Sequence, residues 1–340
     1  MRFKSLKMNS LVKYMFGTMF IVLFSACNQS VKQNDTGQAA TTKITLQRPD
    51  FDKDSAYYFV EQQVKFTPRV PNTKAHKACG LFLINKLSAY ADTVFSQPLK
   101  IKAYNGTLLT GQNIIGIFNP DARKRILLAA HWDSRPYADH DPNYENHRTP
   151  IDGANDGGSG VGVLLEVARQ LHLKSPQIGV DIIFFDLEDY GEPDDERLNY
   201  SGENWCLGSQ AWAKNPHTKN YKAKYGILLD MVGGKNALFT QEGFSRQYAP
   251  DIVDKLWNKA NNLGYSAYFQ DKETNPVLDD HFYINKMINI PTIDIIEWSP
   301  TTETGFNKYW HTINDNMDNI DKETLYVVGT VILSAIYSEK

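Results

Sequence analysis

The sequence predicts an α/β fold: a three-layer sandwich around a mostly parallel, mixed central sheet. Short apolar runs alternate along the chain with longer segments in which apolar residues recur at helical spacing. The short runs are continuously apolar rather than alternating with polar residues, which is typical of strands covered on both faces. Strands that alternate with helices favour a largely parallel sheet with helices on both sides.

Five apolar runs are expected to be strands. They are IIGIF (114–118), ILLAA (126–130), VDIIFF (180–185), GILL (226–229) and TIDII (292–296). Each is short and rich in isoleucine, leucine or phenylalanine, as buried strands are.

The segments around these runs are expected to be helical. Residues 51–66 and 73–95 precede the first strand, a stripe from Val161 to Leu171 follows the second, and residues 247–263 precede the last. A final helix carries Leu325, Val328, Ile332 and Ile336 on one face. Asp321 stands just before it and is a suitable N-cap.

The composition suits one large globular domain, which we expect to span residues 49–340 and to be a monomer. The chain has 340 residues, of which 42% are hydrophobic and 22% are charged. The net charge of −3 gives no indication of a nucleic-acid partner.

The N-terminus is expected to be a targeting segment outside the fold. A basic leader is followed by the apolar run YMFGTMFIVLF, which is shorter than the ~20 residues of a membrane-spanning helix. Residues 1–26 therefore read as a signal peptide, and LFSAC resembles a bacterial lipobox that ends at Cys27. A plain cleaved signal is the alternative. Residues 27–48 are polar and predict a flexible tether, so the chain is expected to be a lipoprotein of the bacterial cell envelope, facing the periplasm or the exterior and anchored through lipidated Cys27.

Two further cysteines, Cys79 and Cys206, follow the lipidation candidate. They could pair in an oxidising compartment, but two cysteines define no disulfide framework. A metal site in this chain would not be built from thiolates.

Chemically active side chains stand where the predicted strands end. ILLAA runs into His131, VDIIFF leads into Glu188 and Asp189, and GILL runs into Asp230. Asp156 lies in a glycine-rich loop just before a helix. In open α/β sheets, ligands bind at the carboxyl ends of the strands, so the sequence predicts a metal or carboxylate-rich site at that edge.

The adjacent acids Glu188 and Asp189 are expected to have different roles, because neighbouring side chains diverge. One can bind a metal while the other faces the substrate as a general base. Asp156 and Asp189, with the late His311, would make three ligands and suit a catalytic zinc with an open fourth position. Adding His131 and Asp230 gives enough ligands for two metals bridged by Asp156, and the sequence allows both counts.

In this order, these residues resemble the zinc aminopeptidase superfamily, from about residue 50 to the C-terminus. Within it, the chain is most similar to the animal-type glutaminyl-peptide cyclotransferases, which also occur in bacteria. That closer resemblance rests on HWDSR, FFDLED, LLDMVGG, DDHFYI and WHTINDNMDNID. The last two are the specific ones, because ordinary aminopeptidases usually lack Asp-Asp-His and do not place a tryptophan before the late histidine.

The resemblance implies one Zn²⁺ per chain, held by Asp156, Asp189 and His311. The reaction would convert the N-terminal glutamine of peptides or proteins into pyroglutamate and release ammonia. Glu188 would carry a proton from the α-amine to the leaving ammonia. Asp230 and Asp279 would form a carboxylate network with it, and carboxylates that close share protons.

Trp310 and Phe306 are the expected substrate-binding residues. Cyclisation requires a glutamine side chain to curl back onto its own amine, and a small, stiff, apolar pocket achieves this by positioning. Asp189 stands where the family usually has glutamate. The tryptophan that animal members carry just after the acidic pair has no counterpart at that spacing, so whether Trp205 replaces it, and whether the loop 190–204 shapes the entrance, stays open.

Two alternatives remain at this point. In a di-zinc aminopeptidase, Glu188 would activate a metal-bound water, and His131 and Asp230 would hold the second metal. In a catalytically inactive surface lipoprotein, the same fold would serve for binding alone.

Overall fold

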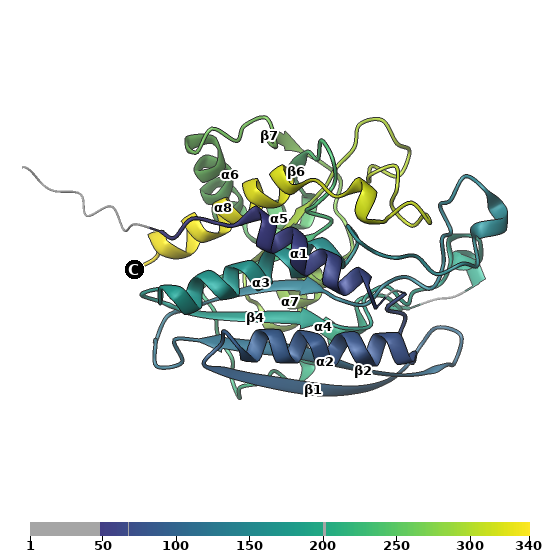
Figure 1. The fold of residues 1–340 in the computed structure, drawn as a ribbon, viewed down its shortest axis with the longest axis horizontal. Coiled ribbons are helices and arrows are strands. Elements are labelled where there is room, and N and C mark those ends of the chain that lie inside the picture. The colour runs from purple at the N-terminus through teal and green to yellow at the C-terminus, as the bar shows by residue number, and fades with distance from the viewer. Residues whose placement is uncertain (1–47, 67, 200–201) are drawn as a thin grey trace, which may run out of the picture. The chain divides into compact units, whose positions relative to one another are not determined.

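The computed structural model describes residues 48–66, 68–199 and 202–340 (Figure 1). Leu46–Lys340 forms a single compact unit. The predicted signal segment, Cys27 and nearly all of the predicted tether lie outside the described residues and stay predictions. In the described part of the chain, no helix combines the length and the apolar character needed to cross a membrane.

A six-stranded mixed sheet forms the centre, in the spatial order β1-β2-β4-β3-β5-β8. β2, β1 and β4 pair antiparallel, whereas β4, β3, β5 and β8 are parallel neighbours. The strands are β1 (Thr93–Lys102), β2 (Leu108–Phe118), β3 (Arg125–His131), β4 (Gly179–Phe185), β5 (Gly226–Asp230) and β8 (Thr292–Ile296). A separate parallel pair consists of β6 (Phe239–Gln241) and β7 (Phe269–Glu273).

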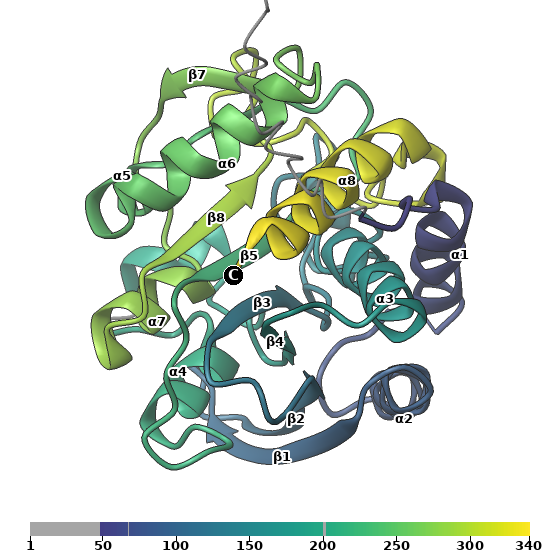
Figure 2. The same ribbon diagram turned by 90° about the vertical axis from the view of Figure 1, so that its left-hand side faces the viewer.

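Helices cover both faces of the sheet, which confirms the predicted three-layer sandwich (Figure 2). One face packs against α1 (Lys53–Val64), α2 (Lys74–Ser88), α3 (Gly158–Leu173), α6 (Pro250–Asn262) and α8 (Lys322–Ser338). The other face packs against α4 (Leu207–Lys214) and α7 (Asp280–Ile288), and α5 (Gly243–Tyr248) precedes α6. Short 3₁₀ turns lie at Tyr144–Asn146, Asp194–Asn199 and Met317–Asn319.

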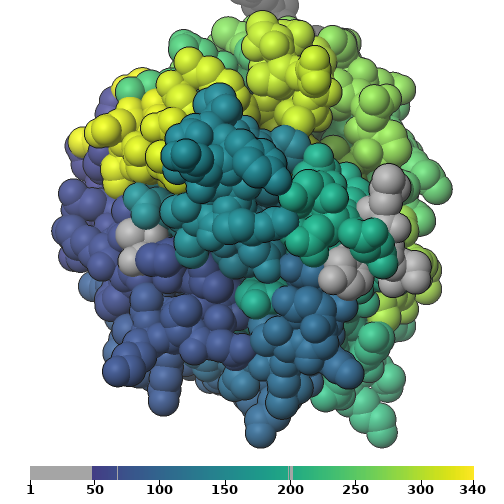
Figure 3. Space-filling model, turned by 90° about the vertical axis from the view of Figure 1, so that its right-hand side faces the viewer, coloured from purple at the N-terminus to yellow at the C-terminus, as the bar shows by residue number. Residues whose placement is uncertain are grey.

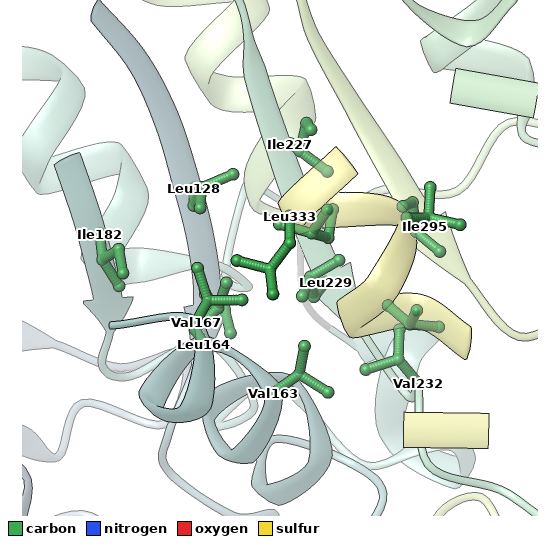
Figure 4. Close-up of a cluster of buried hydrophobic side chains, with 14 of the residues drawn as sticks. Leu128, Val163, Leu164, Val167, Ile182, Ile227, Leu229, Val232, Ile295 and Leu333 are labelled. Atoms are coloured by element: carbon green, nitrogen blue, oxygen red, sulfur yellow. The ribbon is translucent and has the colours of Figure 1, made fainter. Parts of the chain in front are cut away.

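Alternate residues of the central strands enter two different cores. Leu128 packs with Val163 and Leu164 of α3 (Figure 4), whereas the neighbouring Leu127 packs with Trp212 of α4. All of these side chains are fully buried. Burying a leucine stabilises a fold by about 1.5–3 kcal/mol. This two-sided packing explains the continuous apolar runs, and it fixes the carboxyl ends of the strands from which the site is built.

Two helix predictions were wrong in their extent. The helix expected over 73–95 ends at Ser88, and Thr93–Lys102 is the edge strand β1, whose largely exposed side chains give it no clear apolar pattern. The helix expected over 247–263 is two helices, because Pro250 has no N–H to continue α5 and instead begins α6. The predicted cap of the last helix is confirmed, since the Asp321 side chain accepts from the N–H of Glu323.

Candidate active site

The predicted strand-end residues meet at one edge of the sheet. β3 ends at His131, β5 ends at Asp230, and the loop before α3 carries Asp156. His131 Nε2 lies 2.9 Å from an oxygen of Asp156 and 3.2 Å from an oxygen of Asp230. Figure 3 faces this side of the molecule, where segments that are far apart in the sequence adjoin one another.

A cleft of about 1100 Å³ opens at this edge. Its lining includes every predicted ligand, acid and aromatic residue apart from His131: Asp156, Glu188, Asp189, Asp230, Asp279, Phe306, Trp310 and His311. His131 is only 2% exposed, beneath the carboxylates. Residues of the loop 190–204, including Glu192 and Asp194, also line the cleft, as does Trp205 directly after the loop.

Glu188 and Asp189 diverge, as expected for adjacent acids after a strand. Ligand-type atoms of Asp189, Asp156 and His311 lie within 4.8 Å of one another, and those of Glu188, Cys206 and Asp279 form a separate group. The turn is held by Asp133, whose carboxylate accepts from the backbone N–H groups of both acids at 3.1 and 3.3 Å.

Backbone strain is concentrated around the cleft. Among the described residues, four that are neither glycine nor asparagine have positive φ: Leu187, Cys206, Met231 and His311. Leu187 precedes Glu188, and Cys206 contacts its side chain. Met231 follows Asp230, and His311 provides the imidazole that faces Asp156 and Asp189. Bulky residues adopt this conformation at a cost, and such strain gathers at functional sites.

The group of Asp156, Asp189 and His311 has the character of a cation site. All three residues are buried, and His311 Nε2 lies 3.6 Å from Asp156 Oδ2 and 3.5 Å from Asp189 Oδ1. Asp189 Oδ2 is buried and accepts no hydrogen bond from the described residues. Burial, and then the charge of Asp156, raise the pKa of Asp189 to about 6. A bound cation would relieve this repulsion.

A second layer of residues orients His311. Its Nδ1 lies 3.2 Å from Asp139, and Arg135 bonds that carboxylate at 2.8 Å through Nε and also through Nη2. Burial would raise the pKa of Asp139, but Arg135 and His311 together lower it. A carboxylate on the far nitrogen of a ligating histidine is a recurring feature of metal sites. Sequence reasoning missed Asp139, although its partner Arg135 belongs to the HWDSR motif.

His131, Asp156 and Asp230 form an overlapping group that shares Asp156 with the first. Burial lowers the pKa of His131, yet hydrogen bonds to Asp133, Asp156 and Asp230 raise it well above its usual value. Burial raises the pKa of Asp230 to about 7, in spite of the opposing bond to His131. In the di-zinc alternative these three residues would hold the second metal.

Glu188 lies in surroundings that favour its neutral form. Burial raises its pKa well above the usual value, His131 opposes this, and the charges of Asp189 and Asp279 add to the rise. Asp279 caps α7 and belongs to the same group as Glu188. A carboxyl with a raised pKa is a stronger proton acceptor than an ordinary one, which suits a general base.

Aromatic rings form one wall beside His311. The Trp310 ring stacks on the His311 ring at 3.7 Å between centroids, and Phe306 and His140 lie 4.6 and 4.4 Å from Trp310. Trp205 is parallel to His311 at 6.2 Å with an interplanar angle of 4°. It also lies over the Arg135 guanidinium at 4.5 Å. Trp205 therefore reaches the cleft from directly after the loop whose role the sequence left open.

Cys79 and Cys206 are both free and buried. The thiol of Cys206 contacts Glu188 at 3.2 Å, a contact that no sequence motif indicated.

Residues 113–336 match peptidase family M28. The chain belongs to this family. The match covers β3, β4, β5 and β8, the helix α3 and the late histidine, and every residue that lines the cleft lies within it.

Solved structures of similar proteins carry two kinds of name. A glutaminyl cyclase from Tannerella forsythia is 54% identical with a TM-score of 0.84, and covers 86% of this chain and 100% of its own. A Zn-dependent exopeptidase from Parabacteroides distasonis ATCC 8503 is 55% identical with a TM-score of 0.85, with the same coverage of both chains. The glutaminyl-peptide cyclotransferase of Gloydius blomhoffii is 28% identical over 248 residues, which are 64% of this chain and 62% of that protein. The match thus spans about three fifths of that relative's length.

Proposed function

We propose that this M28 protein is a zinc-dependent glutaminyl-peptide cyclotransferase, which converts N-terminal glutamine to pyroglutamate and releases ammonia. The observation that carries the proposal is the stack of Trp310 on His311, beside the carboxylates of Asp156 and Asp189. Metal binding does not require a tryptophan there. A pocket that curls a glutamine side chain onto its own amine requires stiff apolar walls.

Similarity supports the same choice. The Tannerella forsythia protein, named a glutaminyl cyclase, is 54% identical to this chain, and the match covers all of that protein and 86% of this chain. The exopeptidase name of the Parabacteroides distasonis protein keeps a peptidase as the alternative, to be separated by experiment.

Asp156, Asp189 and His311 would hold one zinc ion per chain. Two carboxylates and one imidazole are a suitable donor set for catalytic zinc, and the orphaned Asp189 Oδ2 fits a cation among them. When bound, the ion would supply Lewis-acid polarisation of the γ-amide carbonyl.

The chain's own acids manage the proton. The α-amine nitrogen forms a bond with the side-chain carbonyl carbon, and the bond from that carbon to the amide nitrogen breaks. Glu188 takes a proton from the attacking amine and delivers it to the leaving nitrogen, which departs as ammonia. Besides burial, the charge of Asp279 raises the pKa of Glu188 and also that of Asp230, so these three carboxyl groups would form one proton-sharing network.

The aromatic wall holds the substrate. Trp310 and Phe306 would pack against the glutamine side chain on one side, and Trp205 would close the other side. This arrangement limits the space for water beside the γ-carbonyl, so that the substrate's α-amine rather than water attacks the γ-carbonyl carbon.

The test compares Gln-peptides with leucyl- and alanyl-anilides, using the wild-type protein and Glu188→Gln. We expect ammonia release from the peptides without chain cleavage. The glutamine variant should bind zinc as before but lose about 10²–10⁴-fold in kcat, as removal of a general base does. Anilide hydrolysis without cyclisation would establish the peptidase alternative. Normal turnover by Glu188→Gln would show that another group moves the proton.

A further inference from the structure

Glu188 has a neighbour that the proton-transfer scheme does not use. Cys206, at the N-terminus of α4, is fully buried, and its Sγ lies 3.2 Å from Glu188 Oε1. Among the described residues, no other hydrogen bond to the Glu188 carboxylate is found. The other charged groups near that carboxylate are mostly acids, namely Asp189, Asp279 and Asp280, which oppose its charge.

The thiol acts as a donor here. Burial raises the pKa of Cys206 well above its usual value, and the charge of Glu188 raises it further, so the sulfur keeps its proton. A buried protonated thiol is a weak S–H donor. The contact is therefore an S–H···O hydrogen bond toward Glu188 Oε1 and not a pair of anions.

The backbone fixes both partners of this contact. The N–H of Cys206 donates to the carbonyl of Glu188 at 2.9 Å, and the N–H of Leu207 donates to the carbonyl of Leu187 at 3.0 Å. Leu187 and Cys206 both have positive φ, at 61° and 57°. The paired backbone bonds join the two segments that carry these strained residues, and they place the thiol at Glu188 Oε1. Structures keep such strain where the geometry serves a function.

We propose that Cys206 is a positioning residue for Glu188: its S–H holds Oε1, so that Oε2 is presented to the substrate's amine and to the leaving nitrogen. The terminal torsion of a glutamate is broad and two-fold, so a carboxylate without such a contact rotates freely. One donor on one oxygen removes that freedom. Glu188 Oε2 is left 4.0 Å from His131 Nδ1, on the side of the strand-end carboxylates.

The inference rests on the proposed role of Glu188, and the variants Cys206→Ala and Cys206→Ser test it. Serine keeps a donor at the same place, whereas alanine does not, and both have the same backbone cost at a positive φ. Cys79→Ala is the matched control, because Cys79 is the other buried free cysteine and lies in α2, away from the cleft. We expect Cys206→Ala to lower kcat for a Gln-peptide about tenfold, since a misplaced catalytic group costs rate rather than binding.

In the same variant, KM should stay within about twofold and zinc content should be unchanged, because Cys206 contacts neither substrate nor metal ligands. Cys206→Ser should restore kcat to within about threefold of wild type, and Cys79→Ala should match wild type. Equal losses in the serine and alanine variants, a loss of zinc, or a wild-type kcat in Cys206→Ala would each overturn the inference.

A spectroscopic measurement tests the hydrogen bond without turnover. The S–H stretching band of Cys206, assigned by its absence in Cys206→Ser, should lie at the frequency of a hydrogen-bonded thiol. It should move to that of a free thiol in Glu188→Ala. An unchanged band would refute the contact. If the wild-type protein instead hydrolyses anilides, the proposed function fails by itself, and the same variants are then compared in that reaction, where Glu188 would still be the base.

Discussion

Two of the histidine–carboxylate clusters among the described residues differ in how far they open on the cleft: all three residues of one line it, but only Asp279 of the other does. In the first, His311 faces Asp156 and Asp189 on the cleft floor. In the second, His281 faces Asp279 and Asp294 at the junction of α7 and β8, with His281 and Asp294 fully buried. Both contain the residue types and spacing of a metal site.

The clusters differ in where their charges are balanced. His311 has Asp139 on its far nitrogen, and Arg135 neutralises that acid. On the near side, Arg135 Nη1 lies 3.5 Å from Asp189 Oδ1, and His131 Nε2 lies 2.9 Å from Asp156 Oδ1. His281 donates from Nε2 to Glu242 at 3.0 Å, and Glu242 also accepts from three backbone N–H groups. Burial, and then the charge of Asp279, raise the pKa of Asp294 well above its usual value. The first cluster is the stronger candidate for a metal site because all three of its residues line the cleft.

Matched histidine variants test this difference most strongly. We expect His311→Ala to lose bound zinc and at least about 10³-fold of turnover, because one of three protein ligands is removed. His281→Ala should keep its zinc but lose stability by about 2–4 kcal/mol, because it removes the imidazole partner of the buried Glu242 carboxylate. Zinc content after gel filtration and urea unfolding measure the two effects.

Zinc loss in both variants to the same degree would mean that the second cluster also binds metal. Retention of zinc by His311→Ala would remove this residue from the proposed ligand set.

Acid stability offers a second contrast, centred on Glu242. Burial would raise its pKa, but the bonds from His281 and the backbone lower it to about 2 from 4.5. A depressed carboxyl pKa stabilises the folded state above the unfolded pKa, and that stability is lost as the pH falls toward 2. The shift of roughly 2.5 units corresponds to about 3 kcal/mol at neutral pH.

Glu242→Gln should therefore be about 3 kcal/mol less stable than wild type at pH 7, and the gap should shrink as the pH approaches 2. Unfolding free energies from urea titrations at several pH values give the comparison. Asp294→Asn is the matched control, since burial already favours the neutral form of that carboxyl, and its effect at pH 7 should be much smaller. A gap that does not change with pH would show that Glu242 acts by packing alone.

The sequence was sufficient for the first cluster and not for the second. Asp156 and Asp189 could be placed together because parallel strands deliver their carboxyl ends to one edge, and the apolar runs identify those strands. His311 follows no predicted strand end, and its ligand role came from the order of motifs shared with the family. Glu242 and Asp294 lie within or beside short elements, where no periodic pattern marks a buried acid. Their partners depend on how α5, α7 and β8 pack, and that is a tertiary property.

The same reason explains Cys206 and Trp205. Their positions depend on the path of the loop 190–204 and on a positive φ at Cys206, neither of which can be read from residue type. The edge strand β1 was missed because it is exposed on much of its surface, so burial leaves no pattern in it.

The smallest expected effect concerns Trp310, and it tests what the open side of the first cluster is for. Its ring stacks on His311 and packs at a tilt against Phe306, yet it contributes no atom to the ligand group. Trp310→Ala should raise KM for a Gln-peptide about tenfold, because an apolar wall of this size contributes about 1–3 kcal/mol to the binding of a small side chain. Trp310→Phe should retain most of that affinity, and both variants should keep zinc. Zinc loss in Trp310→Ala would instead make the ring a structural support for His311. In that case the metal alone would distinguish the cleft from the buried cluster. The preference for glutamine would then have to come from Phe306 and Trp205.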